Sequence, residues 1–180
     1  MRAKVAVLDS GVDYVTGINL EGYVNLVEGE EELSPIFQDL TGHGTGIAGI
    51  ISGNGETGIH GVNPHAEVYS VKVLDGENKA PLSRIIKGIY WCIEAEMDII
   101  NMSFGTPVYS KALEQAVKDA DAAGILMVGA AGNGGGAVEY PAAFPEVMAV
   151  VAADPEAEVS EFSNTKANRK YFLYGCAIHS

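Results

Sequence analysis

Short apolar segments recur along this chain, and they restrict its fold more than any other feature of the sequence. The segment 4–8 is apolar from Val5 onward, and 98–102, 125–130 and 147–152 are also rich in apolar residues. A run without polar alternation is typical of a parallel strand that is covered on both faces. The sequence therefore predicts a mainly parallel sheet with buried central strands.

Helical patterns lie between these strand segments. The segment 109–123 ends at Gly124, which suits the residue after a helix. The segment 82–95 has an apolar face at helical spacing. The residues of this apolar face are Ile85, Ile86, Ile89, Tyr90 and Ile93. We expect this face and Trp91 to be buried in the core.

Strands that alternate with helices predict an α/β fold, a three-layer sandwich around a mainly parallel sheet. The chain has 180 residues, of which 47% are hydrophobic. This is enough to bury one sizeable core, so we expect a single domain over residues 1–180.

The segment 41–49, TGHGTGIAG, places His43 between two glycines. A helix is predicted over 43–52, so the imidazole would lie on its first turn and face a cleft. That is a suitable position for a proton acceptor. A glycine-flanked histidine alone is more often an ordinary loop residue, so a functional role needs support from other segments.

Polar residues follow three of the predicted strands. Asp9 comes directly after the strand 4–8, Ser103 follows 98–102, and Asn133 lies in the glycine-rich loop after 125–130. The carboxyl ends of parallel strands meet at one edge of a sheet, and ligand groups collect there. We therefore expect these polar residues at a common edge.

These segments resemble four motifs of the subtilisin-like serine proteases, in the order found in that family. They read VAVLDSGVD around Asp9, GHGTGIAG around His43, NMSFG at 101–105 and AAGN at 130–133. The resemblance covers about residues 4–180 and implies a subtilisin-like fold. It also implies peptide-bond hydrolysis, in which Asp9 orients His43, His43 takes a proton from a serine, and Asn133 stabilises the oxyanion.

The resemblance also implies which residues bind the substrate. The backbone of 75–80 would pair with an extended peptide. Ser103 would support the pocket wall through hydrogen bonds and would not replace the nucleophile. The residues that the family motifs assign to the walls of the groove are Ser103, Phe104, Gly105, Ala131 and Gly132.

Glu139 occupies a position where the family usually has glycine, before a Tyr-Pro pair at the floor of the primary specificity pocket. A carboxylate in that pocket would favour substrates with an Arg or Lys side chain. A Glu139 side chain turned outward to water would have no such effect. The sequence leaves both interpretations open.

The nucleophile of the family lies in a Gly-Thr-Ser-Met-Ala motif, and residues 1–180 contain no such motif. The segment 174–180 resembles the one that precedes it. We therefore expect a C-terminally incomplete peptidase domain that is inactive alone, with Ser180 unable to substitute at a frayed terminus. Expected partners are peptide or protein substrates and a complementing C-terminal segment or an inhibitor.

Two other functions are open to a chain of this kind. One is a non-catalytic pseudoprotease or peptide-binding protein that keeps the groove without the nucleophile. The other is a nucleotide-binding α/β domain with a phosphate loop at 42–46 or 132–136. The latter is disfavoured because no lysine follows either loop.

The net charge of −13 and a pI near 4.5 give the protein an acidic surface. Such a surface repels phosphate backbones and anionic lipids, so neither nucleic acid nor a membrane is an expected partner. The sequence starts without an export signal, which favours a cytoplasmic location. A secreted location is expected if the segment comes from a longer protein.

No cofactor or metal is predicted. A calcium site in the loop 53–58 is the less favoured alternative, because Gly55 stands where relatives have a side-chain ligand. Cys92 and Cys176 do not form a metal-binding spacing, and we expect both as reduced thiols.

Overall fold

The computed structural model describes residues 2–30, 38–56, 58–154, 156, 158–166 and 172–176. Its strands are β1 (Lys4–Asp9), β2 (Leu20–Asn25), β3 (Glu67–Lys72), β4 (Ile99–Met102), β5 (Leu126–Ala130), β6 (Val147–Ala153) and β7 (Phe172–Cys176). Its helices are α1 (His43–Ser52), α2 (Leu82–Glu94) and α3 (Lys111–Ala122). Within these described residues, no helix has both the length and the apolar character needed to cross a bilayer.

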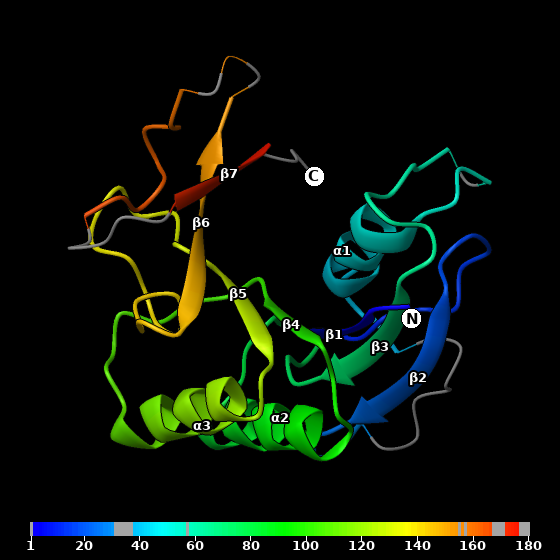
Figure 1. The fold of residues 1–180 in the computed structure, drawn as a ribbon, viewed down its shortest axis with the longest axis horizontal. Coiled ribbons are helices and arrows are strands. Elements are labelled where there is room, and N and C mark those ends of the chain that lie inside the picture. The colour runs from blue at the N-terminus through cyan, green and yellow to red at the C-terminus, as the bar shows by residue number, and fades with distance from the viewer. Residues whose placement is uncertain are drawn as a thin grey trace.

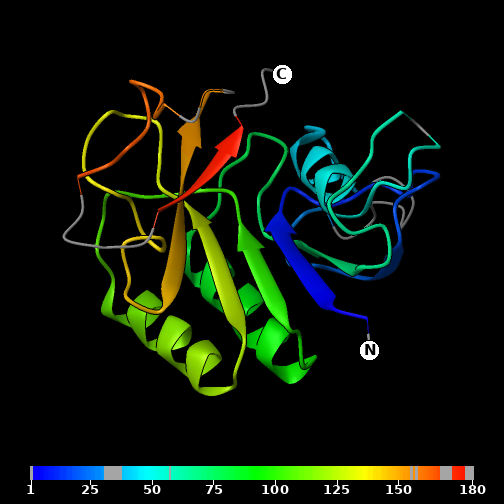
Figure 2. The same ribbon diagram turned by 45° about the horizontal axis from the view of Figure 1, so that its top comes forward.

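The strands form one seven-stranded sheet in the order β2-β3-β1-β4-β5-β6-β7, and neighbouring strands run parallel. Helices α2 and α3 lie side by side on one face, while α1 lies on the other face next to β1 and β3 (Figures 1 and 2). The predicted three-layer α/β fold is confirmed. Because the strands are parallel, the carboxyl ends of β1, β4 and β5 lie at the same edge.

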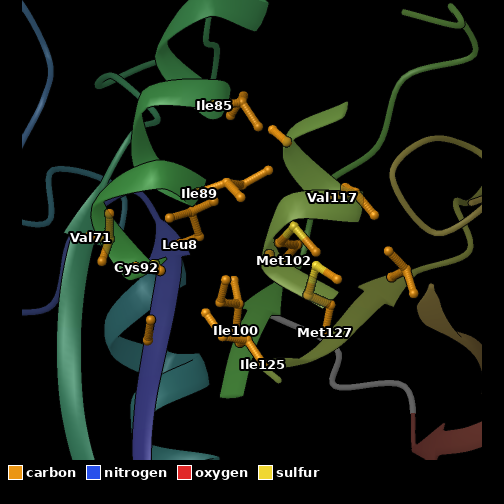
Figure 3. Packing of buried hydrophobic residues seen from close by; sticks show 14 of the residues in the cluster. Leu8, Val71, Ile85, Ile89, Cys92, Ile100, Met102, Val117, Ile125 and Met127 are labelled. Carbon is orange, nitrogen blue, oxygen red and sulfur yellow. The ribbon is translucent and has the colours of Figure 1, made fainter. Parts of the chain in front are cut away.

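The main core fills the space between the sheet and the helices α2 and α3. Leu8 and Ile100 from the sheet are fully buried there with Ile89 of α2 and Val117 of α3 (Figure 3). The prediction that the apolar face of 82–95 is buried is therefore confirmed for Ile85 and Ile89. Burial of this cluster is the main favourable contribution to the packing of α2 and α3 on the sheet.

Tyr90 departs from the prediction, since it is 38% exposed. It follows Ile89 by one residue, a rotation of about 100° around the helix, which moves it to the margin of the apolar face. Its hydroxyl donates a hydrogen bond to Asp119 of α3 at 2.8 Å. Trp91 is partly buried and packs against the core.

The opposite face of the sheet is covered unevenly. Over β1 and β3, Val7 packs against Ala48 of α1 in a second, smaller core. In β4 and β6, alternate residues such as Ile99 and Val150 are only half buried. The expectation of burial on both faces is thus wrong for 147–152, because the helix on this side, α1, contacts β1 and β3.

Candidate active site

Asp9 is the last residue of β1, and its side chain is fully buried at the carboxyl edge of the sheet. Its Oδ1 accepts a hydrogen bond from the Ser10 N–H at 2.7 Å. Its backbone carbonyl accepts hydrogen bonds from the N–H groups of Val73 and Leu74. The turn after β1 and the segment after β3 therefore hold this residue together.

His43 is the first residue of α1, and its imidazole contacts the buried carboxylate. Nδ1 lies 2.7 Å from Asp9 Oδ1. The hydrogen bond to Asp9 is the chief cause that raises the pKa of His43; partial burial opposes it, and the charges of Asp9 and Asp39 add to it. The side chain is 43% exposed. Since Nδ1 faces the carboxylate, Nε2 is the nitrogen that can exchange a proton with another group.

Gly44 allows the first turn of α1 to approach β1 this closely. A Cβ atom at Gly44 would collide with the Gly11 carbonyl oxygen and lie 3.2 Å from Asp9 Cβ. A Cβ atom at Gly46 would meet nothing within 4 Å. The contact between His43 and Asp9 therefore requires glycine at position 44 and not at position 46.

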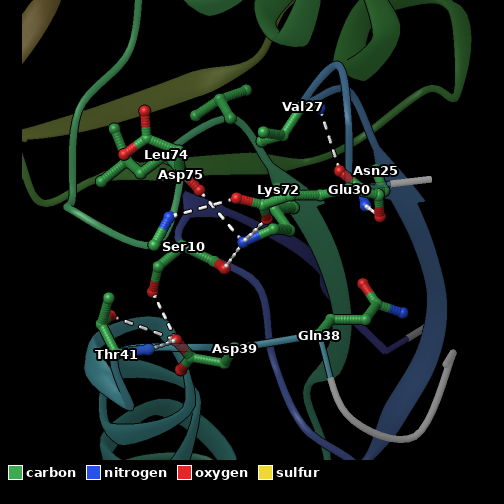
Figure 4. Close-up of polar contacts among 12 residues, drawn as sticks. Ser10, Asn25, Val27, Glu30, Gln38, Asp39, Thr41, Lys72, Leu74 and Asp75 are labelled. Carbon is green, nitrogen blue, oxygen red and sulfur yellow. Dashed lines mark hydrogen bonds and ion pairs between the residues drawn. The ribbon is translucent and has the colours of Figure 1, made fainter. Parts of the chain in front are cut away.

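Asp39 supports the pair from a segment in which sequence reasoning identified no site residue. Its carboxylate accepts a hydrogen bond from the Ser10 hydroxyl at 2.8 Å (Figure 4). It also accepts hydrogen bonds from the Thr45 N–H at 2.8 Å and the Gly42 N–H at 2.9 Å. Burial opposes ionisation of Asp39, but hydrogen bonds from Thr45, Ser10 and Thr41 lower its pKa. An aspartate just before a predicted helix start was the signal for this capping role.

The N–H groups of residues 42–46 are all hydrogen-bonded within the protein. Their acceptors are the side chains of Asp39, Thr41 and Ser10 and the Gly42 carbonyl oxygen. A phosphate bound at a helix N-terminus needs such N–H groups as donors. This geometry disfavours the interpretation of 42–46 as a phosphate loop.

Asn133 lies in an exposed loop that follows β5, at the same edge of the sheet as the end of β1. The buried Asn164 holds this loop, because its Oδ1 accepts hydrogen bonds from the N–H groups of Gly134 at 2.9 Å and Gly136 at 2.8 Å. The Asn164 N–H donates to the Gly132 carbonyl oxygen at 2.9 Å. Sequence reasoning missed this role, since Asn164 and Gly134 are 30 residues apart.

The remaining predicted wall residues lie on two neighbouring segments. The Ser103 hydroxyl accepts a hydrogen bond from Asn101 Nδ2 at 2.9 Å. Phe104 is partly buried against the main core. Ala131 is buried, and its carbonyl oxygen accepts a hydrogen bond from the Glu139 N–H at 3.0 Å.

Glu139 extends between two glycines on these segments. A Cβ atom at Gly105 would lie 2.5 Å from Glu139 Oε2, and one at Gly132 would lie 3.0 Å from Glu139 Cδ. The backbones of Thr106 and Tyr140 exchange two hydrogen bonds of 2.9 Å, which keep the segments side by side. The Glu139 carboxylate therefore lies between Gly105 and Gly132. This position favours the interpretation in which Glu139 faces the substrate over the one in which it turns outward to water.

An apolar cavity of about 460 Å³ lies next to these walls. Residues of the segments 74–82 and 104–108 line its sides, and Ile85, Leu113 and Tyr140 complete it. Ligand pockets have this size and this mainly apolar character. The cavity could accept an apolar side chain of an extended peptide whose backbone runs along the two loops.

Two oxygens at or next to the loop 53–58, where calcium is the less favoured prediction, accept hydrogen bonds within the protein. The Ile59 carbonyl oxygen accepts a hydrogen bond from the Gly55 N–H at 2.9 Å, and Asn54 Oδ1 accepts one from the Glu56 N–H at 3.0 Å. A cation bound by these oxygens would compete with these hydrogen bonds. Among the described residues, no cluster of His, Cys, Asp and Glu side chains could hold a metal ion.

Cys92 is a free thiol that is buried in the main core. Burial raises the pKa of the Cys92 thiol to about 12, so it stays protonated and unreactive. Cys176 ends β7. Ser180 lies outside the described residues.

Comparison with known proteins identifies relatives over nearly the whole chain. A thermostable alkaline protease of Halalkalibacterium halodurans is 44% identical over 163 residues, which cover 89% of this chain and 44% of that protein. Subtilisin Savinase of Lederbergia lenta is 40% identical over 179 residues, which cover 98% of this chain and 65% of that protein. The chain thus spans between 44% and 65% of the length of these relatives.

A solved structure and a family match agree with these relatives. The structure of a mutant of the protease domain of PatA is similar to this chain with a TM-score of 0.80 at 28% identity, covering 97% of this chain and 66% of that one. The Subtilase family matches residues 2–173. With motifs, fold and family match in accord, this chain belongs to the subtilase family.

Proposed function

We propose that this chain supplies the carboxylate, the imidazole and the oxyanion donor of a serine endopeptidase that hydrolyses peptide bonds. The observation that carries the proposal is the 2.7 Å contact between Asp9 Oδ1 and His43 Nδ1. It joins a fully buried carboxylate to a partly exposed imidazole. This geometry prepares a histidine to act as a general base. Membership of the subtilase family supports the same chemistry.

In the proposed reaction, a serine hydroxyl attacks the peptide carbonyl while His43 Nε2 accepts the hydroxyl proton. Asp9 fixes the tautomer of the ring and stabilises the imidazolium that forms. Asn133 donates an N–H to the oxyanion, which would contribute about 3 to 4 kcal/mol of transition-state stabilisation. His43 then gives the proton to the leaving amine, and water releases the acyl group in a second passage through the same steps.

The proposal assigns the serine to a segment outside residues 1–180, on the same polypeptide or on a complementing chain. Residues 1–180 contain no Gly-Thr-Ser motif. The half-buried face of β4, β5 and β6 supports the idea, since such a segment could pack there. In subtilisin, loss of the serine lowers turnover about a million-fold, and we expect a polypeptide limited to 1–180 to be inactive to a similar degree.

The substrate in this proposal is an extended peptide that lies between the loops 74–80 and 103–105. The apolar cavity would take one of its side chains. The side chain next to the cleaved bond would lie against the walls that contain Gly105 and Gly132. The Glu139 carboxylate lies close to both glycines, so we propose a preference for Arg or Lys at this position, because a cation would pair with the carboxylate.

The catalytic proposal is tested in a chain that includes the serine segment. Such a chain should react with a fluorophosphonate probe and cleave peptides. Asp9→Asn should lower kcat about ten-thousand-fold, because the imidazole loses its correct tautomer. Asp119→Asn on α3 is the control and should leave kcat unchanged. Equal activity of Asp9→Asn and wild type would exclude the mechanism.

The substrate preference is tested by Glu139→Gln in the same chain. We expect the preference for basic over apolar peptides to fall about ten- to a hundredfold in kcat/KM. Glu158→Gln, which lies away from the pocket segments, is the control. An unchanged ratio in Glu139→Gln would show that this carboxylate does not face the substrate.

Peptide binding without hydrolysis is the second candidate. It is favoured by one observation: all the residues that line the apolar cavity lie between Leu74 and Pro141, so the cavity forms without a nucleophile segment. In that case peptides would bind to the chain that includes the serine segment, while the fluorophosphonate probe would leave this chain unlabelled. Labelling of a serine would exclude this candidate.

We also propose that the loop 53–58 folds without calcium, because Asn54 Oδ1 and the nearby Ile59 carbonyl oxygen accept hydrogen bonds with which a cation would compete. The melting temperature should then be the same in EDTA and in millimolar calcium. A melting temperature that falls in EDTA and recovers with calcium would contradict this.

A further inference from the structure

Lys72, the last residue of β3, has the largest fully buried side chain in the described part of the chain. Its ammonium donates hydrogen bonds to the carbonyl oxygens of Ser10 at 2.6 Å and Leu74 at 3.1 Å. Glu30 Oε2 lies 3.1 Å from the same nitrogen (Figure 4). A lysine is almost never buried completely unless it is paired, and these groups are its partners.

Ser10 connects the buried ammonium to the candidate active site. Its carbonyl oxygen binds Lys72, its N–H donates to Asp9 Oδ1, and its hydroxyl oxygen accepts a hydrogen bond from the Gly44 N–H at 3.0 Å. Gly44 belongs to the first turn of α1, which also carries His43. A displacement of Ser10 would therefore move both members of the carboxylate–imidazole pair.

The other contacts of the ion pair lead to the cavity. Lys72 binds the carbonyl oxygen of Leu74, and Glu30 Oε1 accepts a hydrogen bond from the Gly76 N–H at 3.2 Å. Leu74 and other residues of the loop 74–80 line the apolar cavity. The same two charged side chains thus hold the turn after Asp9 and the rim of the cavity.

We propose that Lys72 and Glu30 are positioning residues that fix the Asp9–His43 pair relative to the loop 74–80, a role that rests on the function proposed above for these two features. A buried ion pair is a poor means of adding stability, because desolvation opposes the Coulomb attraction, and apolar side chains of similar volume often do as well. Apolar side chains cannot, however, bind two carbonyl oxygens and an N–H from separate loops. That requirement accounts for the charged pair.

The chain offers a matched control for the test. Lys118 and Glu114 form an exposed ion pair of 2.7 Å on α3, far along the chain from the site. Lys72→Met and Lys118→Met therefore make the same chemical change, one in the buried pair and one at the surface. Glu30→Ala removes the other buried partner together with the acceptor for the loop.

The experiment measures amide hydrogen exchange by NMR in the chain and these variants. In Lys72→Met, we expect the Ser10, Gly44 and Gly76 amides to exchange at least about tenfold faster, while Val117 in the core of α3 keeps its rate. The resonance of the His43 Nδ1 proton, which reports the contact with Asp9, should weaken in the same variant. Lys118→Met should change neither observable.

A purely stabilising role predicts a different result, because loss of global stability accelerates all slow amides together. Equal acceleration at Val117, or unchanged rates at Ser10 and Gly76, would overturn the proposal. If Lys72→Met does not fold, Glu30→Ala decides by the same criteria. Exchange does not depend on hydrolysis, so a protein that cleaves no peptide but shows the local response would contradict the proposed function and keep the positioning role.

Discussion

The two halves of the sheet differ in how many of their faces are covered. β1 is buried along almost its whole length, between α1 on one face and α2 on the other. In β6, burial alternates residue by residue. The sequences of both strands are mainly apolar. An apolar run therefore identifies a strand, but the number of covered faces depends on what the rest of the chain places against it.

This difference extends to the candidate site. Asp9 lies in the half that is covered on both faces, where a buried carboxylate must be held by hydrogen bonds. Asn133 follows β5 in the half that is covered on one face, and its side chain is exposed. Hydrogen bonds at the end of β1 and the start of α1 thus hold the carboxylate–imidazole pair, whereas Asn133, the proposed oxyanion donor, lies on an exposed loop.

Two adjacent isoleucines in β4 give the largest expected contrast between the faces. Ile100 is fully buried against α2 and α3, whereas Ile99 points to the other face and is half buried. Ile100→Ala should lower the free energy of unfolding by about 3 to 5 kcal/mol through lost burial and a cavity. Ile99→Ala should cost about 1 kcal/mol. Urea unfolding at equal m-values measures both.

The Ile99 and Ile100 variants can also contradict this difference between the two faces of the sheet. A segment that covers β4, β5 and β6 should raise the cost of Ile99→Ala toward that of Ile100→Ala when it is present. Similar costs in the chain limited to residues 1–180 would show that both faces are already covered there.

Two glycines in α1 sharpen the comparison on the covered half. A side chain at Gly44 would meet the Gly11 carbonyl oxygen, so Gly44→Ala should lower stability by about 2 to 3 kcal/mol and separate His43 from Asp9. Gly46 faces open space, so Gly46→Ala should raise stability by about 0.5 to 1 kcal/mol. Thermal unfolding distinguishes the two, and equal shifts would mean that α1 does not pack on β1 as described.

Features encoded locally could be predicted from the sequence. The run that ends at Asp9 indicates a strand with a carboxylate at its end, and the glycines around His43 indicate a helix start with an exposed imidazole. The structure places both as expected, 2.7 Å apart. The alternation of strands and helices was sufficient for the layers of the fold, because each element shows its own periodicity.

Features that depend on contacts between distant segments could not be predicted. Glu30 lies in the acidic segment 28–32, and nothing in that segment indicates that it pairs with the buried Lys72 of β3. Asp39 lies in the same irregular region, and its role depends on Ser10 and Thr45 reaching it in the fold. Residue type and spacing carry no record of such partners.

The smallest expected effect is a pH dependence from the carboxylate–imidazole pair. The hydrogen bond to Asp9 is the chief cause that raises the pKa of His43 above its ordinary value of 6.5. The resulting stabilisation is complete below pH 6.5 and is lost as the pH rises through the folded-state pKa. Because His43 is 43% exposed, solvent screens the interaction, and we expect less than about 1 kcal/mol.

Urea unfolding over this pH interval should show the stability of wild type falling relative to that of Asp9→Asn. A difference that stays constant or rises with pH would mean that the buried carboxylate does not hold the proton of this imidazole, although the covered half of the sheet brings the two within 2.7 Å.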